Sequence, residues 1–527
     1  MRTNTLCLLL LCISFSIIGR SQPGSLDSSF STNGRTKTVM GVNFSNLNYI
    51  TIQNDGKILA VGGAVMGLQS TDSFALARYM PDGSPDKKFG NKGKLIMGIG
   101  TSFSYATYAT TLPDKKILVA GYSGGHYNSD FVLLQLKENG TPDSSFGTNG
   151  IVFTDINVQD IAKQIILQPD GKIIMAGNSN NQAEQFPNTD IAMVRYFANG
   201  RIDSSFGTNG KVVTNIAKSE GVFSVQLRDD GKLMLAGFVS FDIVSDNFLL
   251  ARYKQNGRLD SSFGVNGYLL SEAFKDYQFT SVAAQKDNKY VVAALCSDTV
   301  DNINFAALRF KQDASLDKAF AKHGITSTDF FGKSDIAQKV LIQKDGKVIV
   351  TGYTRLENNS SAAAVVRYDE KGVLDSSFGI NGKVCNVTKK YSELYAAALQ
   401  DDGKIVVGGY VDVGQFPVYS CFLVARLIGN GEPAVRNNIE NNIELKGLDK
   451  IGAFPNPVTD EIHISGLNAS QTYNFTIADF KGSVVATKLS IKDEVFYTLR
   501  LYNLSKGLYY LTVSSNDGKK TFKFLKQ

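Results

Sequence analysis

The amino-acid sequence predicts an all-β protein built from repeats, and three observations lead to this prediction. Two short motifs, typified by "LQPDGKI" (167–173) and "IDSSFGTNG" (202–210), alternate along most of the chain. Each occurs seven times, at a period of about 58 residues. Within a period the apolar residues form short β-rich runs separated by turn signals, without the 3.6-residue period of a helix.

The number of strands per period predicts the architecture. The fourth copy, for example, contains the four runs "KVVTNI", "VFSVQL", "KLMLAGF" and "NFLLARY". Four antiparallel strands repeated seven times favour a seven-bladed β-propeller over residues 22–431, because radial repetition leaves each blade only short protected edges. A parallel β-helix is the alternative, but its rungs are usually much shorter than this period.

The first motif has the chemistry of a hairpin turn between the second and third runs. Pro169, Asp170 and Gly171 suit a type I turn followed by a left-handed residue. Asn288 and Lys115 each replace that glycine once, and asparagine tolerates the left-handed region better than lysine does.

The second motif is interpreted as structural punctuation. Its Asp and Ser are residues that cap tight turns, its Phe supplies a buried anchor, and its Gly supplies a special backbone angle. Catalysis is disfavoured because it needs asymmetry among its groups, and near-identical copies have none. We expect no metal or other cofactor; a bound calcium ion is the alternative, since one Asp with backbone carbonyls can contribute to such a site. The expected anchors are Phe30, Phe89, Phe146, Phe206, Phe263, Phe320 and Phe378.

The two ends of the array predict a closed ring. The last copy has its hairpin and its fourth strand but no second motif, whereas "LDSSFSTNG" (26–34) has no hairpin before it. The N-terminal segment therefore completes the unit that the C-terminal segment begins. In five copies an Arg at the end of the fourth strand precedes the motif Asp by eight residues. We expect bidentate Arg–Asp pairs, with Asp27 supplying the carboxylate for Arg426; arginines that face solvent are the alternative.

These motifs resemble a known family. "LQPDGKI", "ARY" and "LDSSFG" in register are similar to the delta-60 repeat family of bacterial secreted and surface proteins, over roughly residues 24–431. The resemblance implies a propeller that usually has no assigned catalytic activity.

The last part of the chain has a different character. Residues 432–449 form an Asn-rich linker, and residues 450–527 contain "FPNPVTDEIHI", "LSKGLYYLTV" and "KKTFKFLKQ" in that order. These three segments resemble the type A sorting domain of the type IX secretion system. The resemblance implies a small Ig-like β-sandwich that the type IX machinery recognises at the outer membrane. An ordinary accessory sandwich domain is the alternative.

The N-terminus predicts an export signal over residues 1–21. Arg2 precedes the apolar stretch "LCLLLLCISFSII", and Gly19 and Ser21 suit a cleavage site. A membrane anchor is the alternative, but about 13 apolar residues fall short of the roughly 20 that a spanning helix needs. We therefore expect no transmembrane segment in the mature chain, which would pass the periplasm to an extracellular or outer-membrane surface location.

Charge and histidine content argue against several functions. The net charge is +6, but the leader and the C-terminal region carry the excess, so residues 22–449 are close to neutral. A neutral body disfavours nucleic acid as a partner. Only three histidines occur, far apart in the sequence, which excludes a zinc site of several histidines, and no Gly-x-Ser-x-Gly elbow is present. We expect a protein without catalytic activity.

The loops between the third and fourth runs vary most between copies and would share one rim of the propeller. They carry aromatic residues beside Asn, Gln and Asp, which suits glycan stacking or protein docking. The leading hypothesis is a secreted or surface propeller that binds a glycan or a protein through this face. The alternative is a carbohydrate-active hydrolase or lyase with paired carboxylates in the central channel. The candidate ligand-binding residues are Tyr122, Tyr127, Phe186, Phe241, Phe416 and Tyr419.

Overall fold

The computed structural model describes two compact units, one within residues 1–432 and one within 433–527. The described residues are 22–429 and 451–527, apart from gaps at 43, 67–71, 101, 126–127, 182–187, 242–245, 271–276, 286, 300–301, 357–359, 386, 389–390, 416–417, 455–457, 459, 466, 468–470, 480–482, 492–495 and 516–517. The predicted leader and linker lie outside the described residues.

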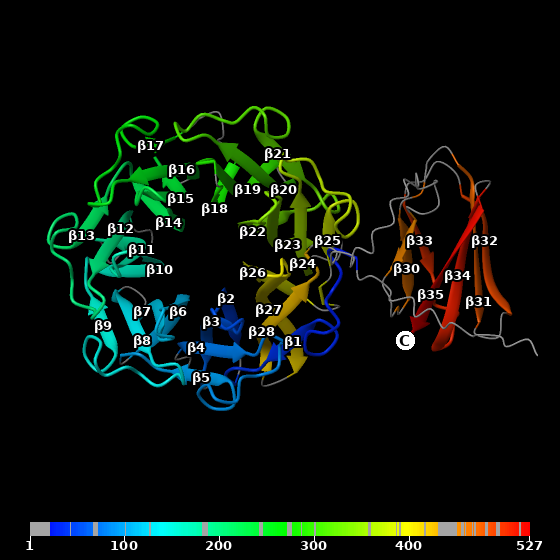
Figure 1. Ribbon diagram of the computed structural model, residues 1–527, viewed down its shortest axis with the longest axis horizontal. Helices are drawn as coiled ribbons and strands as arrows, with labels where there is room; N and C mark the ends of the chain where they lie inside the picture. Colours follow the sequence, from blue (N-terminus) through cyan, green and yellow to red (C-terminus); the bar gives the residue numbers. More distant parts are fainter. Residues whose placement is uncertain are drawn as a thin grey trace, which may run out of the picture. The chain divides into compact units, whose positions relative to one another are not determined.

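The first unit is a ring of antiparallel sheets, and we call each four-stranded sheet a blade (Figure 1). The described residues contain strands and turns but no helix, so the predicted all-β propeller is confirmed. No described segment is a helix that could span a membrane. The blades are β2–β5 (Ser45–Ile52, Ile58–Val65, Asp72–Tyr79, Lys94–Met97), β6–β9 (Phe103–Thr111, Ile117–Gly125, Asn128–Leu136, Ile151–Thr154), β10–β13 (Gln159–Leu167, Ile173–Asn180, Thr189–Tyr196, Lys211–Thr214), β14–β17 (Ser219–Leu227, Leu233–Ser240, Asp246–Tyr253, Tyr268–Leu269), β18–β21 (Tyr277–Ala284, Tyr290–Thr299, Asn302–Phe310, Ile325–Thr328) and β22–β25 (Asp335–Ile342, Val348–Arg355, Ser361–Tyr368, Lys383–Cys385).

Two neighbouring blades share a backbone bridge. A single parallel bridge between Gln159 of β10 and Ser129 of β8 links blades β6–β9 and β10–β13 into one eight-stranded sheet.

The last blade closes the ring with strands from both ends of the array. Its order is β1-β28-β27-β26, with β1 at Arg35–Thr38 and the others at Val418–Leu427, Ile405–Gln415 and Ser392–Leu399. Arg35 pairs with Ala425, and Thr38 pairs with Phe422. Figure 1 shows β1 (blue) beside β28 (yellow). The N-terminal segment therefore completes the blade that the C-terminal segment begins, as the phase of the repeats predicts.

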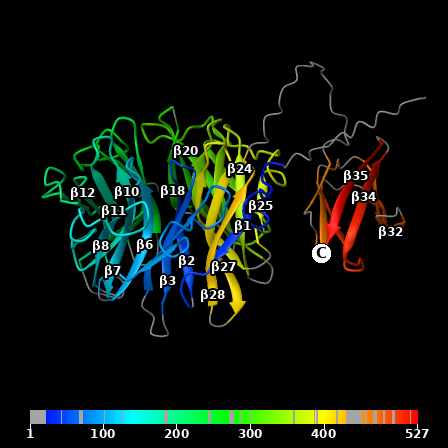
Figure 2. The ribbon, with the colours of Figure 1, turned by 60° about the horizontal axis from the view of Figure 1, so that its bottom comes forward.

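The strands run between the two ends of the ring (Figure 2), which gives the propeller two rims. The motif rim holds the hairpin turns after the innermost strands and the Asp-Ser-Ser-Phe loops. The variable rim holds the loops between the second and third strands of each blade and the crossings from each outermost strand to the next innermost strand.

The hairpin turns of the motif rim have the predicted backbone. The residue after the turn Asp has a positive φ in every copy: 82° at Gly171, 60° at Asn288 and 68° at Lys115, for example. His323 adopts a φ of 60° in the second motif, where five other copies have Asn with a φ between 50° and 56°. His323 is therefore part of a repeated turn.

The core of the first unit lies between neighbouring blades. Apolar side chains of adjacent blades, such as Phe248 and Phe279 with ring centroids 4.1 Å apart, pack in one cluster. The repeat phenylalanines are buried, with at most 1% of their surface exposed, and a Cβ added at Gly83 would lie 2.7 Å from the ring of Phe30. Each phenylalanine thus anchors its loop against a neighbour, and glycine provides the space.

The second unit consists of two antiparallel sheets. One has the order β29-β30-β33, at Gly452–Phe454, Glu461–Ser465 and Phe496–Arg500. The other has the order β32-β31-β34-β35, at Val484–Ile491, Tyr473–Asp479, Gly507–Ser515 and Gly518–Lys526. A core that includes Phe475, Leu511 and Phe524 holds this unit together. Its Ig-like class stays a prediction.

Candidate functional site

On the motif rim the same network of ion pairs recurs in most blades. Arg195 Nε lies 2.8 Å from Asp203 Oδ2, and Lys172 Nζ of the hairpin motif lies 3.2 Å from the same oxygen. The Arg195 guanidinium also stacks over the Phe206 ring, 4.7 Å from its centroid. The two sequence motifs recur together because their charged residues meet at one carboxylate.

At the ring closure the same contacts join residues that are far apart in the sequence. Arg426 Nε donates to Asp27 Oδ2 at 2.8 Å, Lys404 Nζ lies 3.4 Å from that oxygen, and Arg426 stacks over Phe30. Arg426 Nη1 donates to Pro81 O of the following blade. The contacts of Arg426 therefore connect the last blade with the N-terminal segment, at Asp27, and with blade β2–β5, at Pro81.

The pairs lack the bidentate form that we expected. Both Nε and Nη2 of Arg426 lie 2.8 Å from the same oxygen, Oδ2 of Asp27. Oδ1 instead accepts hydrogen bonds from the backbone N–H and the hydroxyl of Ser29, at 3.0 and 2.6 Å. One oxygen caps the turn while the other binds cations, so no second oxygen is left for the guanidinium fork.

The electrostatics of Asp27 follow from these contacts. Burial raises the pKa of its carboxyl, but the hydrogen bonds from Ser29 and the charges of Arg426 and Lys404 outweigh burial, and the pKa lies below its usual value. In the second copy Gln135 replaces the arginine, and Lys116 Nζ lies 2.9 Å from Asp143. Its hydrogen bond, followed by those from Ser145, lowers the pKa of Asp143 to about 2. The motif rim thus uses its charged groups for internal contacts.

Three of the six predicted ligand-binding aromatics, Tyr122, Phe241 and Tyr419, lie among the described residues. Tyr127, Phe186 and Phe416 lie outside the described residues. Tyr122 on β7 is partly buried against Tyr105, with ring centroids 6.1 Å apart, and burial raises its pKa to about 12. Phe241 is 57% exposed.

Tyr419 belongs to an exposed aromatic pair. Its ring stacks on Phe44 at a centroid distance of 5.1 Å and an interplanar angle of 18°. Tyr419 is 40% exposed and Phe44 is 52% exposed. Phe44 precedes β2 and Tyr419 lies on β28, so the pair sits where the ring closes.

A second aromatic group, the Glu393 cluster, was not predicted from the sequence. Tyr391 and Ser361 each donate a hydroxyl hydrogen bond to Glu393 Oε1 at 2.8 Å, and Tyr395 donates to Oε2 at 2.5 Å. The rings of Tyr395 and Tyr410 stack at 6.0 Å. The signal in the sequence is "YSELY" (391–395), a start that the other innermost strands lack.

Three buried carboxyl groups support the crossings between blades on this rim. Asp160, Glu220 and Asp335 occupy the same register position at the start of their innermost strands and are fully buried. Each accepts a backbone N–H from the crossing before it: Ile156 at 2.6 Å, Ile216 at 2.9 Å and Phe330 at 2.8 Å, respectively. Asp130 and Asp155 bring their carboxylates within 4.8 Å of Asp160, but Asp160 already accepts from Ile156, Asn157 and Ser179. These groups act as loop caps.

We expect these three groups to make the protein less stable as the pH rises. Burial, chiefly, raises the pKa to about 6 at Asp160, about 7 at Glu220 and about 7 at Asp335. Between the unfolded-state and folded-state pKa values the folded state holds more protons, so the free energy of unfolding falls with rising pH. The melting temperature of the wild type should drop between pH 5 and pH 8. The triple variant with Asp160→Asn, Glu220→Gln and Asp335→Asn should show a smaller drop over the same range. A wild-type melting temperature that is constant over this range would contradict the prediction.

The centre of the ring holds a cavity of about 410 Å³. All the innermost strands contribute to its lining, including Tyr49 on β2, Tyr108 on β6, Gln164 on β10 and Lys339 on β22. Among the described residues that line it, none is a carboxylate. The paired carboxylates that a glycosidase needs are therefore absent from this lining.

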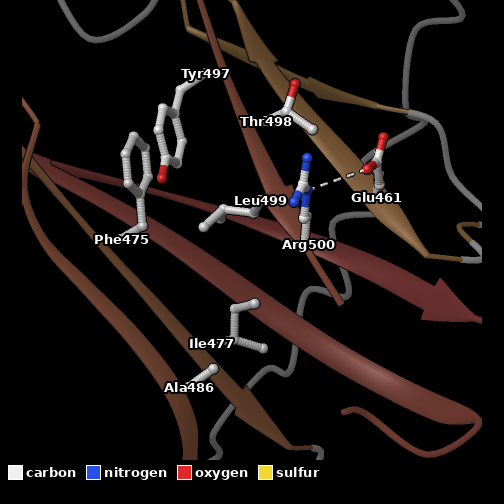
Figure 3. A pocket seen from close by; sticks show the side chains of 8 residues that line it. All are labelled: Glu461, Phe475, Ile477, Ala486, Tyr497, Thr498, Leu499 and Arg500. Carbon is white, nitrogen blue, oxygen red and sulfur yellow. Dashed lines mark ion pairs between the residues drawn. The ribbon is translucent and has the colours of Figure 1, made fainter. Parts of the chain in front are cut away.

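The C-terminal unit has a pocket of about 640 Å³ between its two sheets (Figure 3). Phe475 and Tyr497 stack at one end with ring centroids 5.3 Å apart, and Arg500 forms an ion pair with Glu461, Nε to Oε1 at 3.5 Å, at the other. The pocket therefore combines an apolar wall with a charged edge.

Comparison with known families and structures gives two family matches. A family described as a domain of unknown function (DUF5122) beta-propeller matches residues 53–89, 112–146, 168–206, 228–263 and 343–378. A family described as a secretion system C-terminal sorting domain matches residues 452–527. The search of curated proteins found no match.

Several solved structures are similar in outline. A glucose dehydrogenase is 12% identical, covering 61% of this chain and 95% of its own, with a TM-score of 0.37. An α-L-arabinanase from Penicillium chrysogenum, complexed with arabinobiose, is 11% identical, covering 60% and 92%, with a TM-score of 0.35. An α-L-arabinofuranosidase from Fusarium graminearum is 9% identical, covering 75% and 97%, with a TM-score of 0.36.

Proposed function

We propose that this chain, which carries β-propeller repeats and a secretion-system C-terminal sorting domain, is a binding module that the type IX machinery exports and that recognises a glycan through its variable rim. The sorting domain implies export to the cell surface or the extracellular space. The observation that carries the binding proposal is the exposed Phe44–Tyr419 pair beside the ring closure.

The two rims support this assignment in different ways. On the motif rim the charged and aromatic side chains of the repeats contact one another, as Arg195, Asp203 and Phe206 do. The variable rim departs from the repeat and exposes aromatic side chains such as Phe44 and Tyr419. Flat aromatic faces stack on the apolar faces of sugar rings, while acceptors nearby bind their hydroxyls. A protein ligand on the same face is the other outcome that a binding screen would reveal.

We expect Tyr419→Ala and Phe44→Ala each to weaken glycan binding about tenfold, because each removes half of a stacked platform. The measurement is a glycan array with the full mature chain, followed by titration of the best glycan. The matched control is Phe153→Ala, because Phe153 is also an exposed aromatic, at 48%, but lies on the outermost strand β9.

The outcomes separate the hypotheses clearly. Absence of any glycan above background would contradict glycan recognition, and a pull-down that captures one protein through Tyr419 would replace it with protein recognition. Turnover of a polysaccharide in an activity screen would instead support the hydrolase or lyase alternative.

A further inference from the structure

One register position on the innermost strands differs sharply between blades. Each innermost strand has a register shift in its pairing with the next strand of the blade: one residue is skipped, and pairing resumes at the residue after it. We call the residues at which pairing resumes the channel layer: Tyr49, Tyr108, Gln164, Ser224, Ser281, Lys339 and Ala396. The layer contains one charged residue, Lys339, and the other members are neutral.

Lys339 lies against the central cavity, and no Asp or Glu is found among the described residues that line this cavity. Among the described residues that line the cavity of about 410 Å³, it is the one that carries a charge. In the described part of the chain it has no hydrogen-bond acceptor or carboxylate partner, and its Nζ lies over the ring of Tyr49, 5.7 Å from the centroid. Burial lowers its pKa to about 8.

The neighbours of Lys339 explain how its side chain reaches the cavity. Strand β26 lies between β22 and β2 in the ring (Figure 1), and it contributes Ala396 to the channel layer. Ala396 is fully buried, and Lys339 Nζ lies 5.7 Å from the centroid of the Tyr49 ring. Tyr49 and Tyr108 stack next to it with ring centroids 3.9 Å apart.

We propose that the channel cavity binds a small organic anion whose carboxylate pairs with the Lys339 ammonium. A largely desolvated cation without a counter-charge is unfavourable, and an anion in the adjoining cavity removes that cost. The cavity has the volume of a site for one small molecule. Its lining adds the Tyr49–Tyr108 rings and the neutral side chains of Gln226 and Thr51, which suit a hydroxylated body such as a sugar acid. This site is separate from the variable rim.

The test is titration calorimetry of the full mature chain with D-glucuronate, D-glucose and acetate. We expect glucuronate to bind, glucose to bind at least tenfold more weakly, and acetate to show whether the charge alone suffices. Lys339→Met should weaken glucuronate binding at least tenfold. The matched control is Lys163→Met, because Lys163 is also a largely buried lysine on an innermost strand, with a pKa lowered by burial, but does not line the cavity.

Thermal unfolding supplies a readout that does not depend on heats of binding. Glucuronate should raise the melting temperature of the wild type and of Lys163→Met but leave that of Lys339→Met unchanged. If Lys339→Met does not fold, Lys339→Gln replaces it. Equal weakening by the Lys339 and Lys163 substitutions would overturn the proposal, as would the absence of binding by every anion. Because the Phe44 and Tyr419 variants leave this cavity intact, failure here is distinguishable from failure of glycan binding at the rim.

Discussion

Asp27→Ala should destabilise the propeller by about 3–5 kcal/mol and release the N-terminal segment from the last blade. Asp27 and Arg426 are 6% and 5% exposed, so the substitution leaves a buried guanidinium and the Lys404 ammonium without their shared carboxylate. It also removes the cap that accepts from Ser29. Urea-induced unfolding measures the loss of stability, and hydrogen exchange of the β1 amides measures the release.

Asp203→Ala is the matched control for this prediction. Asp203 makes the same contacts with Arg195, Ser205 and Lys172, but its arginine lies eight residues away on a continuous chain. We expect a similar loss of stability without release of any terminal segment. The blade that contains Asp203 is one continuous stretch of chain, so no terminal strand depends on this pair. Unchanged exchange of β1 in Asp27→Ala would show that the ring closure does not depend on this pair.

The sequence was sufficient to predict the ring because two independent features of the repeats indicate it. The period of the two motifs indicates the blades, and the missing halves at the two ends indicate their closure. The pairing of Asp27 with Arg426 followed from the eight-residue spacing in the other copies, and the structure shows that contact. The predicted bidentate geometry was wrong, because Ser29 donates to Asp27 Oδ1 and leaves only Oδ2 for Arg426. The spacing of Arg and Asp in the sequence does not show that Ser29 competes for this carboxylate.

Other features depend on register, which the sequence does not display. The contact between Lys172 and Asp203 joins a hairpin turn to a loop 31 residues later, and only the assembled blade brings them together. Likewise, no turn signal marks the register shift that precedes Lys339 in β22, and only the assembled ring shows that Lys339 lines the cavity. The aromatic candidates chosen from loop variation included Tyr419 but missed Phe44, its stacking partner from another part of the chain.

The two rims therefore differ in role: the motif rim carries the repeated stabilising contacts, and the variable rim carries the side chains that differ between blades. Contacts such as those of Arg195 repeat around the motif rim: the arginine contacts an aspartate and a phenylalanine, and a lysine contacts the same aspartate. A change at one of these residues therefore removes a contact of another. The variable rim and the channel layer are held by backbone pairing, so their side chains differ between blades without loss of the fold. Departures from the repeat are for this reason the best guide to function in such an array.

Phe524→Asp should block export and leave the protein in the periplasm. Phe524 on β35 is 1% exposed and stacks on Tyr509, with ring centroids 5.7 Å apart, in the core of the sorting unit. A carboxylate at that position would be buried without a partner, which costs several kcal/mol in a unit of this size. The unit would unfold, and the secretion machinery would have no folded sorting domain to recognise. Fractionation and immunoblotting of periplasm, surface and medium measure the outcome.

Leu525→Asp is the matched control, because the adjacent side chain is 42% exposed on the opposite face of β35. The same carboxylate there is solvated, so we expect export to continue. The end of the chain is otherwise well held: Lys526 Nζ lies 3.2 Å from Asp460, and Gln527 N–H donates to Val458 O at 2.8 Å. Export of Phe524→Asp at the wild-type level would show that recognition needs only the sequence of the tail. A block by Leu525→Asp with the unit still folded would place the recognition surface on the exposed face of β35.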